Sequence, residues 1–246
     1  MTTIITTSWD DGDALDERLS DLLDRYGVKG TFYIARDYRK HRIADDVIKR
    51  IAQHHEIGAH TLTHPNLMQI SPEKRRQEIE WSKAWLEDIV GKEVPLFCYP
   101  GGKFDDAVVE AVRAAGFRGA RTTQKEAGEL STDPFRFGVS VTLYPKPFTQ
   151  YDHAIAGYRR LLEPLGTGVP NFLQAEFLQL QHSWETYARA LFDEVHARSD
   201  IFHLYGHSWA NTRYGMWPVL ERFLAYISKR RDCIYLTNSE MLERLS

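Results

Sequence analysis

Two acidic residues stand side by side near the start of the chain, in the segment S-W-D-D-G at residues 8–12. Neighbouring carboxylates repel each other, so the pair gains little in a purely structural segment unless water or a cation separates the charges. Further along, H-T-L-T-H at residues 60–64 places two imidazoles four positions apart, the spacing that brings side chains to one side of a helical turn. One carboxylate and two imidazoles leave coordination positions open, which is typical of a catalytic divalent metal site.

The elements expected around these residues bring them to one rim of a sheet. Strands predicted over residues 3–7 and 56–60 end at the acid pair and at the first histidine. Catalytic groups of parallel α/β folds gather at the carboxyl ends of strands. Gly12 favours the sharp turn that aims two neighbouring acids at one centre. If one acid binds a cation, the other remains free to act as a general base.

Strands and helices alternate along most of the chain, which predicts parallel pairing, right-handed crossovers and closure into a barrel. Further strands are expected over residues 30–35, 118–122, 135–141 and 233–237. Helices are expected over residues 13–26, 72–90, 106–115, 184–197 and 218–229, with one more through 47–51 and a short last helix at the end of the chain. Residues 143–172 are rich in proline and aromatic residues, and we expect them to form loops that shape specificity or an interface. No break in composition marks a second domain, so residues 1–246 are interpreted as one catalytic domain.

Composition narrows the classes of function. The net charge is -3 and no basic face is long enough to follow a phosphate backbone, which argues against a nucleic-acid partner. The two cysteines, Cys98 and Cys233, lie in no C-x-x-C motif, so neither a disulfide framework nor a zinc ribbon is predicted. The N-terminus lacks the pattern of a signal peptide and no apolar run has membrane-spanning length, which leads us to expect a cytoplasmic protein of unspecified oligomeric state.

S-W-D-D-G resembles the T-F-D-D-G motif, and H-T-L-T-H the H-[ST]-x-x-H motif, of the polysaccharide deacetylase family, also known as the NodB homology domain or carbohydrate esterase family 4. F-C-Y-P-G-G at 97–102 resembles the third motif, and the segment 204–207 a late L-x-x-x-H-like motif. The resemblance implies an irregular (β/α) barrel of about seven parallel strands with the NodB-like deacetylase fold. It implies hydrolysis of an N-acyl group, usually acetyl, from an amino sugar.

The resemblance also implies roles for single residues. Asp11, His60 and His64 would bind one divalent metal ion, with zinc expected first and cobalt, manganese, nickel or iron as alternatives. Asp10 would be the base and His207 the acid that protonates the leaving amine. Substrate contacts are expected from Tyr99, Pro100 and Gly101 of the third motif, where the backbone N–H of Gly101 would help to hold the oxyanion. Further contacts are expected from Trp9 and Trp209, which stand beside the base and the acid in the sequence.

The chain departs from the family pattern at the third motif. Cys98 occupies the place of the arginine that orients the base, and we interpret it as a small buried side chain. Arg136 is the first candidate for the missing arginine and Arg121 the second. His203 competes with His207 as the acid, but only a residue at the carboxyl end of its strand reaches the rim, which favours His207.

Without an export signal, the expected substrate is an acylated precursor of a surface polysaccharide. An allantoinase-like hydrolase of a small cyclic amide or ureide would share the same metal ligands and remains an alternative. A carbohydrate-binding barrel without activity is a second alternative, which the presence of Asp10, Asp11, His60 and His64 together disfavours.

Overall fold

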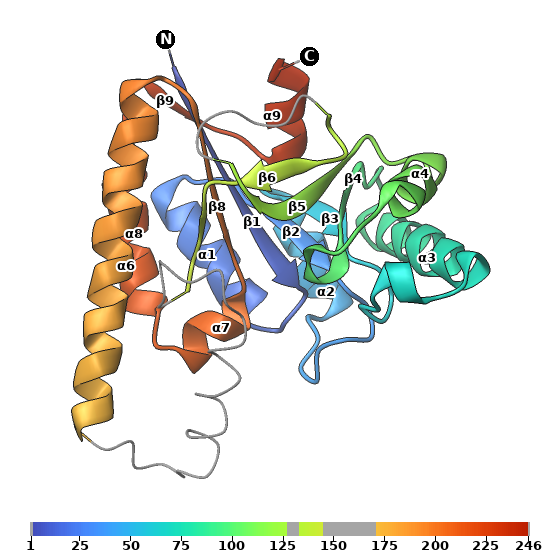
Figure 1. The fold of residues 1–246 in the computed structure, drawn as a ribbon, viewed down its shortest axis with the longest axis horizontal. Coiled ribbons are helices and arrows are strands. Elements are labelled where there is room, and N and C mark those ends of the chain that lie inside the picture. The colour runs from blue at the N-terminus through green and yellow to red at the C-terminus, as the bar shows by residue number, and fades with distance from the viewer. Residues whose placement is uncertain (1, 127–132, 145–170, 246) are drawn as a thin grey trace.

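A computed structural model describes residues 2–126, 133–144 and 171–245, in which parallel strands form a sheet that curves nearly into a barrel (Figure 1). The strands are β1 (Thr3–Asp11), β2 (Thr31–Ile34), β3 (Glu56–Ala59), β4 (Leu96–Cys98), β5 (Gly119–Lys125), β6 (Phe137–Val139), β7 (Val141–Thr142), β8 (Ile201–Gly206) and β9 (Cys233–Tyr235). Their order in the sheet is β6-β5-β4-β3-β2-β1-β8-β7, and β9 pairs with the beginning of β1. The expected α/β barrel of parallel strands is therefore confirmed, with nine strands among the described residues instead of about seven.

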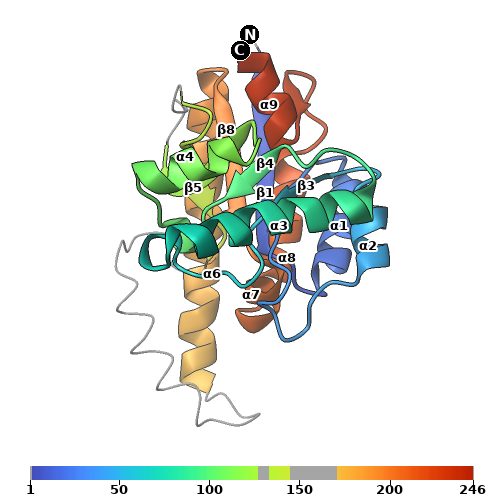
Figure 2. The ribbon, with the colours of Figure 1, turned by 90° about the vertical axis from the view of Figure 1, so that its right-hand side faces the viewer.

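Helices surround this sheet, with the long α6 on one side and α3 and α4 on the other (Figure 1). Their bounds are α1 (Asp16–Tyr26), α2 (Asp45–Ile51), α3 (Pro72–Val90), α4 (Asp106–Ala114), α6 (Asn171–Ala197), α7 (Ser208–Arg213), α8 (Trp217–Ile227) and α9 (Asn238–Leu245), with short 3-10 turns η1 (Leu67–Gln69) and η2 (Pro100–Gly102). Figure 2 shows the N-terminus and the C-terminus together at one end of the molecule. None of the helices in the described part of the chain is long and apolar enough to span a bilayer.

The alternation of β1 separates its two faces. Ile5 and Trp9 are fully buried in the large apolar cluster that includes the surrounding helices. Ser8 and Asp10 belong to the opposite face, where they contact His203 of β8 and Arg121 of β5. The inside of the barrel is therefore partly polar, and the charged site is built on that face.

Local signals set most helix ends as predicted. The Ser71 hydroxyl accepts a hydrogen bond from the Lys74 N–H at the start of α3, and Gly91 ends that helix in the left-handed conformation. The start expected for the helix over 184–197 is wrong, because α6 already begins at Asn171. The expectation for residues 143–172 falls largely on 145–170, which lie outside the described residues.

Candidate active site

Four strands of one sheet, β1, β3, β4 and β8, bring the residues of the candidate site to the same rim. Asp10 and Asp11 end β1, and His60 directly follows β3. Cys98 ends β4, and His207 follows β8. Because β4, β3, β2, β1 and β8 are neighbours in the sheet, side chains distant in the sequence meet above its carboxyl edge.

The three predicted metal ligands face one another. The Nε2 atoms of His60 and His64 lie 3.8 and 3.7 Å from the same Asp11 oxygen, Oδ1. Asp11 and His60 are almost completely buried, while His64 is half-buried at the open side. A carboxylate oxygen and two imidazole nitrogens at this separation fit a zinc-type ion that retains open positions for substrate.

The orientation of His60 supports this fit. Its Nδ1 lies 2.8 Å from the Cys98 carbonyl oxygen, which fixes Nδ1–H as the donor and leaves the Nε2 lone pair facing Asp11. Burial lowers the pKa of His60 from 6.5 to about 4, although Asp10 and Asp11 oppose this. His60 is therefore neutral at physiological pH, the state in which an imidazole binds a metal.

The loop that carries His64 is held by an acid that the sequence analysis did not single out. Glu78 of α3 is buried and accepts hydrogen bonds from the N–H groups of Leu62 and Thr63, both at 2.9 Å, and from the Thr63 hydroxyl at 2.7 Å. No sequence motif marks this role, because Glu78 lies on an ordinary amphipathic helix. We describe Glu78 as a positioning residue for the histidine loop.

The backbone is unusual at the ligands. Asp11, Thr61 and His64 have positive φ values of 86°, 68° and 55°, which non-glycine residues rarely adopt. Gly12 follows at 73°, and a Cβ atom there would lie 2.5 Å from the Ile34 Cγ2 atom of β2. The expected turn at Gly12 is present, and it requires glycine both for its conformation and for this close approach.

Arg121, the second of the two candidate arginines, makes the contact with Asp10. It is fully buried on β5, and its Nη2 donates to Asp10 Oδ1. The first candidate, Arg136, is wrongly placed for this role: it is partly exposed and pairs with Asp106 at 2.6 Å and with Asp133 at 3.0 Å. The reason is topological, since β5 directs Arg121 into the barrel whereas Arg136 precedes β6 on the outside.

This ion pair controls the charge of Asp10. Burial alone would raise the pKa of Asp10, but Arg121, His60 and His207 outweigh burial and lower it from 3.8 to about 2. The Cys98 thiol lies 3.5 Å from the other Asp10 oxygen and is fully buried, as expected for a small strand side chain. Burial raises the pKa of Cys98, so it remains a neutral thiol beside the carboxylate.

His207 lies at the rim and His203 does not. The His207 Nε2 is 4.0 Å from Asp11 Oδ2 and 3.2 Å from the Tyr205 hydroxyl. His203 is buried between the Ser8 hydroxyl at 2.8 Å and the Gly138 carbonyl at 2.9 Å, so both of its ring nitrogens are engaged. The geometry favours His207 as the residue that reaches a substrate.

The expected substrate contacts divide into two groups. Trp209 lies beside the site, where its indole N–H donates to Asp11 Oδ2 at 2.7 Å, and Gly101 is exposed on η2 with a φ of 61°. Trp9 is fully buried and donates to the Thr7 hydroxyl, so the substrate contact predicted for it is wrong.

The side chains of the third motif point inward. Tyr99 is fully buried, stacks on Phe104 and donates to the Phe135 carbonyl at 2.9 Å, so the expected side-chain contact with substrate is wrong. Pro100 is also buried at the start of η2. Of this motif, only the backbone around Gly101 is left at the surface.

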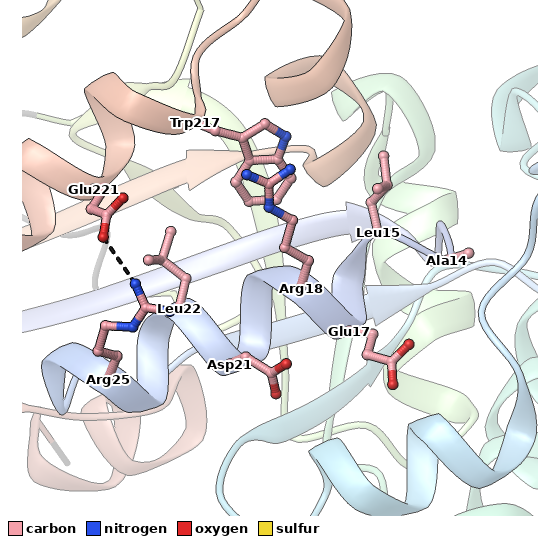
Figure 3. A pocket seen from close by; sticks show the side chains of 9 residues that line it. All are labelled: Ala14, Leu15, Glu17, Arg18, Asp21, Leu22, Arg25, Trp217 and Glu221. Carbon is pink, nitrogen blue, oxygen red and sulfur yellow. Dashed lines mark hydrogen bonds and ion pairs between the residues drawn. The ribbon is translucent and has the colours of Figure 1, made fainter.

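An open hollow lies elsewhere on the surface of the molecule. A hollow of about 440 Å³ between α1 and α8 is lined by charged side chains and by Trp217, which the Arg18 guanidinium covers at 4.2 Å (Figure 3). Arg25 and Glu221 form an ion pair of 3.0 Å across it. None of the predicted site residues lines this hollow, so the chemistry is assigned to the strand rim.

Comparison with known proteins shows which family the chain resembles. A model of the family described as polysaccharide deacetylase matches residues 2–120, the segment that contributes Asp10, Asp11, His60 and His64. The resemblance to the polysaccharide deacetylase family is confirmed. A peptidoglycan-N-acetylglucosamine deacetylase of Bacillus cereus is 34% identical over 117 residues, which are 47% of this chain and 54% of that protein. The chain therefore spans only about half of the length of this curated deacetylase.

Solved structures of deacetylases extend the likeness to the rest of the fold. A Mycobacterium smegmatis protein provisionally assigned as a polysaccharide deacetylase superposes with a TM-score of 0.70 at 17% identity, over 99% of this chain and 90% of that one. A mutant of a CE4 family pseudoenzyme with restored enzymatic activity superposes with a TM-score of 0.58 at 16% identity, over 98% of this chain and 68% of that one. At these identities the likeness shows the deacetylase fold alone.

Proposed function

We propose that this protein is a metal-dependent hydrolase that removes an N-acyl group, most simply acetyl, from an amino sugar used to build a surface polysaccharide. The observation that carries the proposal is the convergence of the Asp11, His60 and His64 ligand atoms, which all lie within 4.8 Å of one another, beside a carboxylate held by a buried arginine. This is the donor set of a hydrolytic metal site with room for water and an acyl oxygen.

In this proposal Asp11, His60 and His64 hold one divalent ion, with zinc as the first expectation. When bound, such an ion polarises the acyl carbonyl and makes a water molecule more acidic. Asp10 accepts the proton of the attacking water through the carboxylate oxygen that faces His60, whose Nε2 lies 3.9 Å away. Arg121 keeps Asp10 ionised and fixes the direction of its oxygens.

His207 would protonate the nitrogen that leaves when the C–N bond breaks. Burial lowers the pKa of His207 while Asp11 and Asp10 oppose this, so a proton placed on the imidazole is readily given up. The Tyr205 hydroxyl, 3.2 Å from Nε2, helps to fix the ring. The backbone N–H of Gly101 would support the developing oxyanion.

The test is the metal content and the acyl release of the parent protein and two variants. Asp10→Asn should retain the metal and lose turnover by several orders of magnitude, whereas His64→Ala should lose both. Acyl release would be measured on acylated amino sugars, on a polymeric substrate and on cyclic ureides. The assignment would be contradicted if the parent protein held no metal after incubation with zinc, or if Asp10→Asn kept near-normal turnover. Cleavage of ureides alone would favour the allantoinase-like alternative.

A further inference from the structure

A strongly basic loop follows β2, next to the proposed site. Residues 36–42 read R-D-Y-R-K-H-R, with four cationic side chains and one acid in a chain whose net charge is -3. We call this segment the 36–42 loop. Such a local excess of positive charge at the mouth of a site favours anionic ligands.

Backbone hydrogen bonds fasten the 36–42 loop to both halves of the site. The Ala14 N–H donates to the His41 carbonyl at 2.7 Å, and the Ile43 N–H to the Gly12 carbonyl at 2.9 Å. On the other side, the Asp37 N–H donates to the Leu62 carbonyl at 2.7 Å. The loop therefore spans from the acid pair to the histidine loop, and its position does not depend on side chains alone.

Two side chains of the loop lie against the proposed metal ligands and their partners. The Tyr38 ring, 44% exposed, stacks on the His64 imidazole with 4.1 Å between centroids. The Arg39 guanidinium lies 4.6 Å from the centre of the Trp209 ring, whose N–H donates to Asp11. An exposed aromatic face and a guanidinium thus flank the proposed metal centre.

The charges of the loop are only partly neutralised. Arg36 pairs with Asp37 at 2.8 Å and Arg42 with Asp45 at 2.7 Å. Arg39 uses its Nε for Asp13, at 3.0 Å, and this contact together with the Trp209 ring holds its guanidinium in place. Lys40 is exposed and forms no ion pair with any residue that the structure describes.

We propose that the 36–42 loop binds a phosphate group attached to the sugar substrate, with Arg39 as the main donor, Lys40 adding charge and Tyr38 stacking against the sugar ring. This inference rests on the proposed function and names its substrate class. In a 2-amino sugar, the acylated nitrogen is one ring carbon away from the anomeric position, so a phosphate there stays near the reacting group. A fixed guanidinium binds phosphate through two parallel hydrogen bonds, which a neutral polymer does not offer.

The experiment compares zinc-loaded parent protein on N-acetylglucosamine and its phosphorylated forms: the 1-phosphate, the nucleotide-diphosphate sugar and a lipid-diphosphate sugar in detergent. We expect kcat/KM for at least one phosphorylated form to exceed that of the neutral sugar by about 10- to 100-fold, through KM and less so at high salt. Their relative kcat/KM values distinguish a free, a nucleotide-linked and a lipid-linked phosphate.

Arg39→Gln should lower kcat/KM for the phosphorylated sugar about 10- to 100-fold more than for the neutral sugar, and so remove most of this preference. Arg25→Gln changes the net charge equally, but Arg25 is 64% exposed and pairs with Glu221 at the far end of α1, so it should retain the preference. Equal kcat/KM for all substrates, or an equal loss on neutral and phosphorylated sugars in Arg39→Gln, would overturn the inference.

Calorimetric binding of the same sugars to Asp10→Asn separates this inference from the proposed function. Arg39-dependent binding of a phosphorylated sugar without hydrolysis by the parent would retain the phosphate site and refute the deacylase. Hydrolysis of acyl sugars with no preference for phosphate would retain the deacylase and refute the phosphate site.

Discussion

Replacement of Arg121 by methionine tests the electrostatic basis of the site. The substitution conserves much of the side-chain volume but removes the cation that faces Asp10, a residue only 2% exposed. Because Asp10 then loses its partner inside the barrel, its carboxylate becomes an uncompensated buried charge. We expect the variant to be strongly destabilised and its Asp10 to take up a proton at higher pH than in the parent.

The magnitude follows from two independent arguments. Removal of one partner of a buried ion pair typically costs about 3–5 kcal/mol. The lowering of the Asp10 pKa from 3.8 to about 2 corresponds to about 2 kcal/mol of net stabilisation, after burial has acted in the opposite direction. For a domain of this size, a loss of about 3–5 kcal/mol lowers Tm by roughly 6–20 °C.

The assay is thermal unfolding of metal-free protein in chelator, arranged as a double-mutant cycle of Arg121→Met and Asp10→Asn. Removal of both charges should cost less than the sum of the single substitutions, with a coupling free energy of at least about 2 kcal/mol. Arg136→Met is the matched control, because Arg136 forms its ion pairs at the surface and should contribute no more than about 1 kcal/mol. Additive single effects, or equal costs for Arg121→Met and Arg136→Met, would refute the buried pairing.

Three further predictions concern the ligands and their supports. Glu78→Gln should loosen the histidine loop and raise the Kd for zinc by about 10- to 100-fold in a metal titration, and an unchanged Kd would remove Glu78 from the positioning role. Gly12→Ala should lower Tm more than Gly27→Ala. Both glycines have a positive φ, but only at Gly12 would the new Cβ meet a neighbouring atom, Ile34 Cγ2 at 2.5 Å. Equal losses of Tm would contradict the steric argument. Burial lowers the pKa of His60 to about 4, so between pH 6.5 and about 4 the unfolded chain binds a proton that the folded chain does not. The free energy of unfolding of the metal-free protein should therefore decrease by up to about 3 kcal/mol as the pH is lowered from 6.5 to about 4. A His60→Asn variant with the same pH slope would disprove this.

The sequence predicts well which residues meet at the strand rim, because its signals are local. Asp10 and Asp11 are neighbours, His60 and His64 are four apart, and each motif lies where a strand ends. Parallel pairing then brings those ends together without further information. The fold class follows from the same alternation of strands and helices.

The choice between Arg121 and Arg136 depends on which strand position faces the barrel, and this depends on register. Cys98 of β4 pairs with Arg121 of β5, so both side chains approach Asp10 from neighbouring strands. Such a relation joins residues far apart in the chain and leaves no local pattern.

The error at Trp9 is different, because period-two alternation alone places it on the face opposite to Asp10. Its burial against the helices was therefore predictable from the sequence. The role of Glu78 was not predictable, since two of its three hydrogen bonds come from backbone N–H groups of a loop, which leave no pattern in the sequence.

The site is assembled from two separate stretches of the chain. Asp11, His60, His64 and Arg121 all precede residue 126, whereas His207 follows residue 200 on a strand that pairs directly with β1. Substitutions in the second stretch can thus alter the surroundings of His207 without changing the residues that form the Asp11, His60 and His64 cluster. If the chain were cut between residues 126 and 171, one fragment would hold Asp11, His60, His64 and Arg121 and the other would hold His207. Pairing of β8 with β1 is the step that would bring the two fragments together.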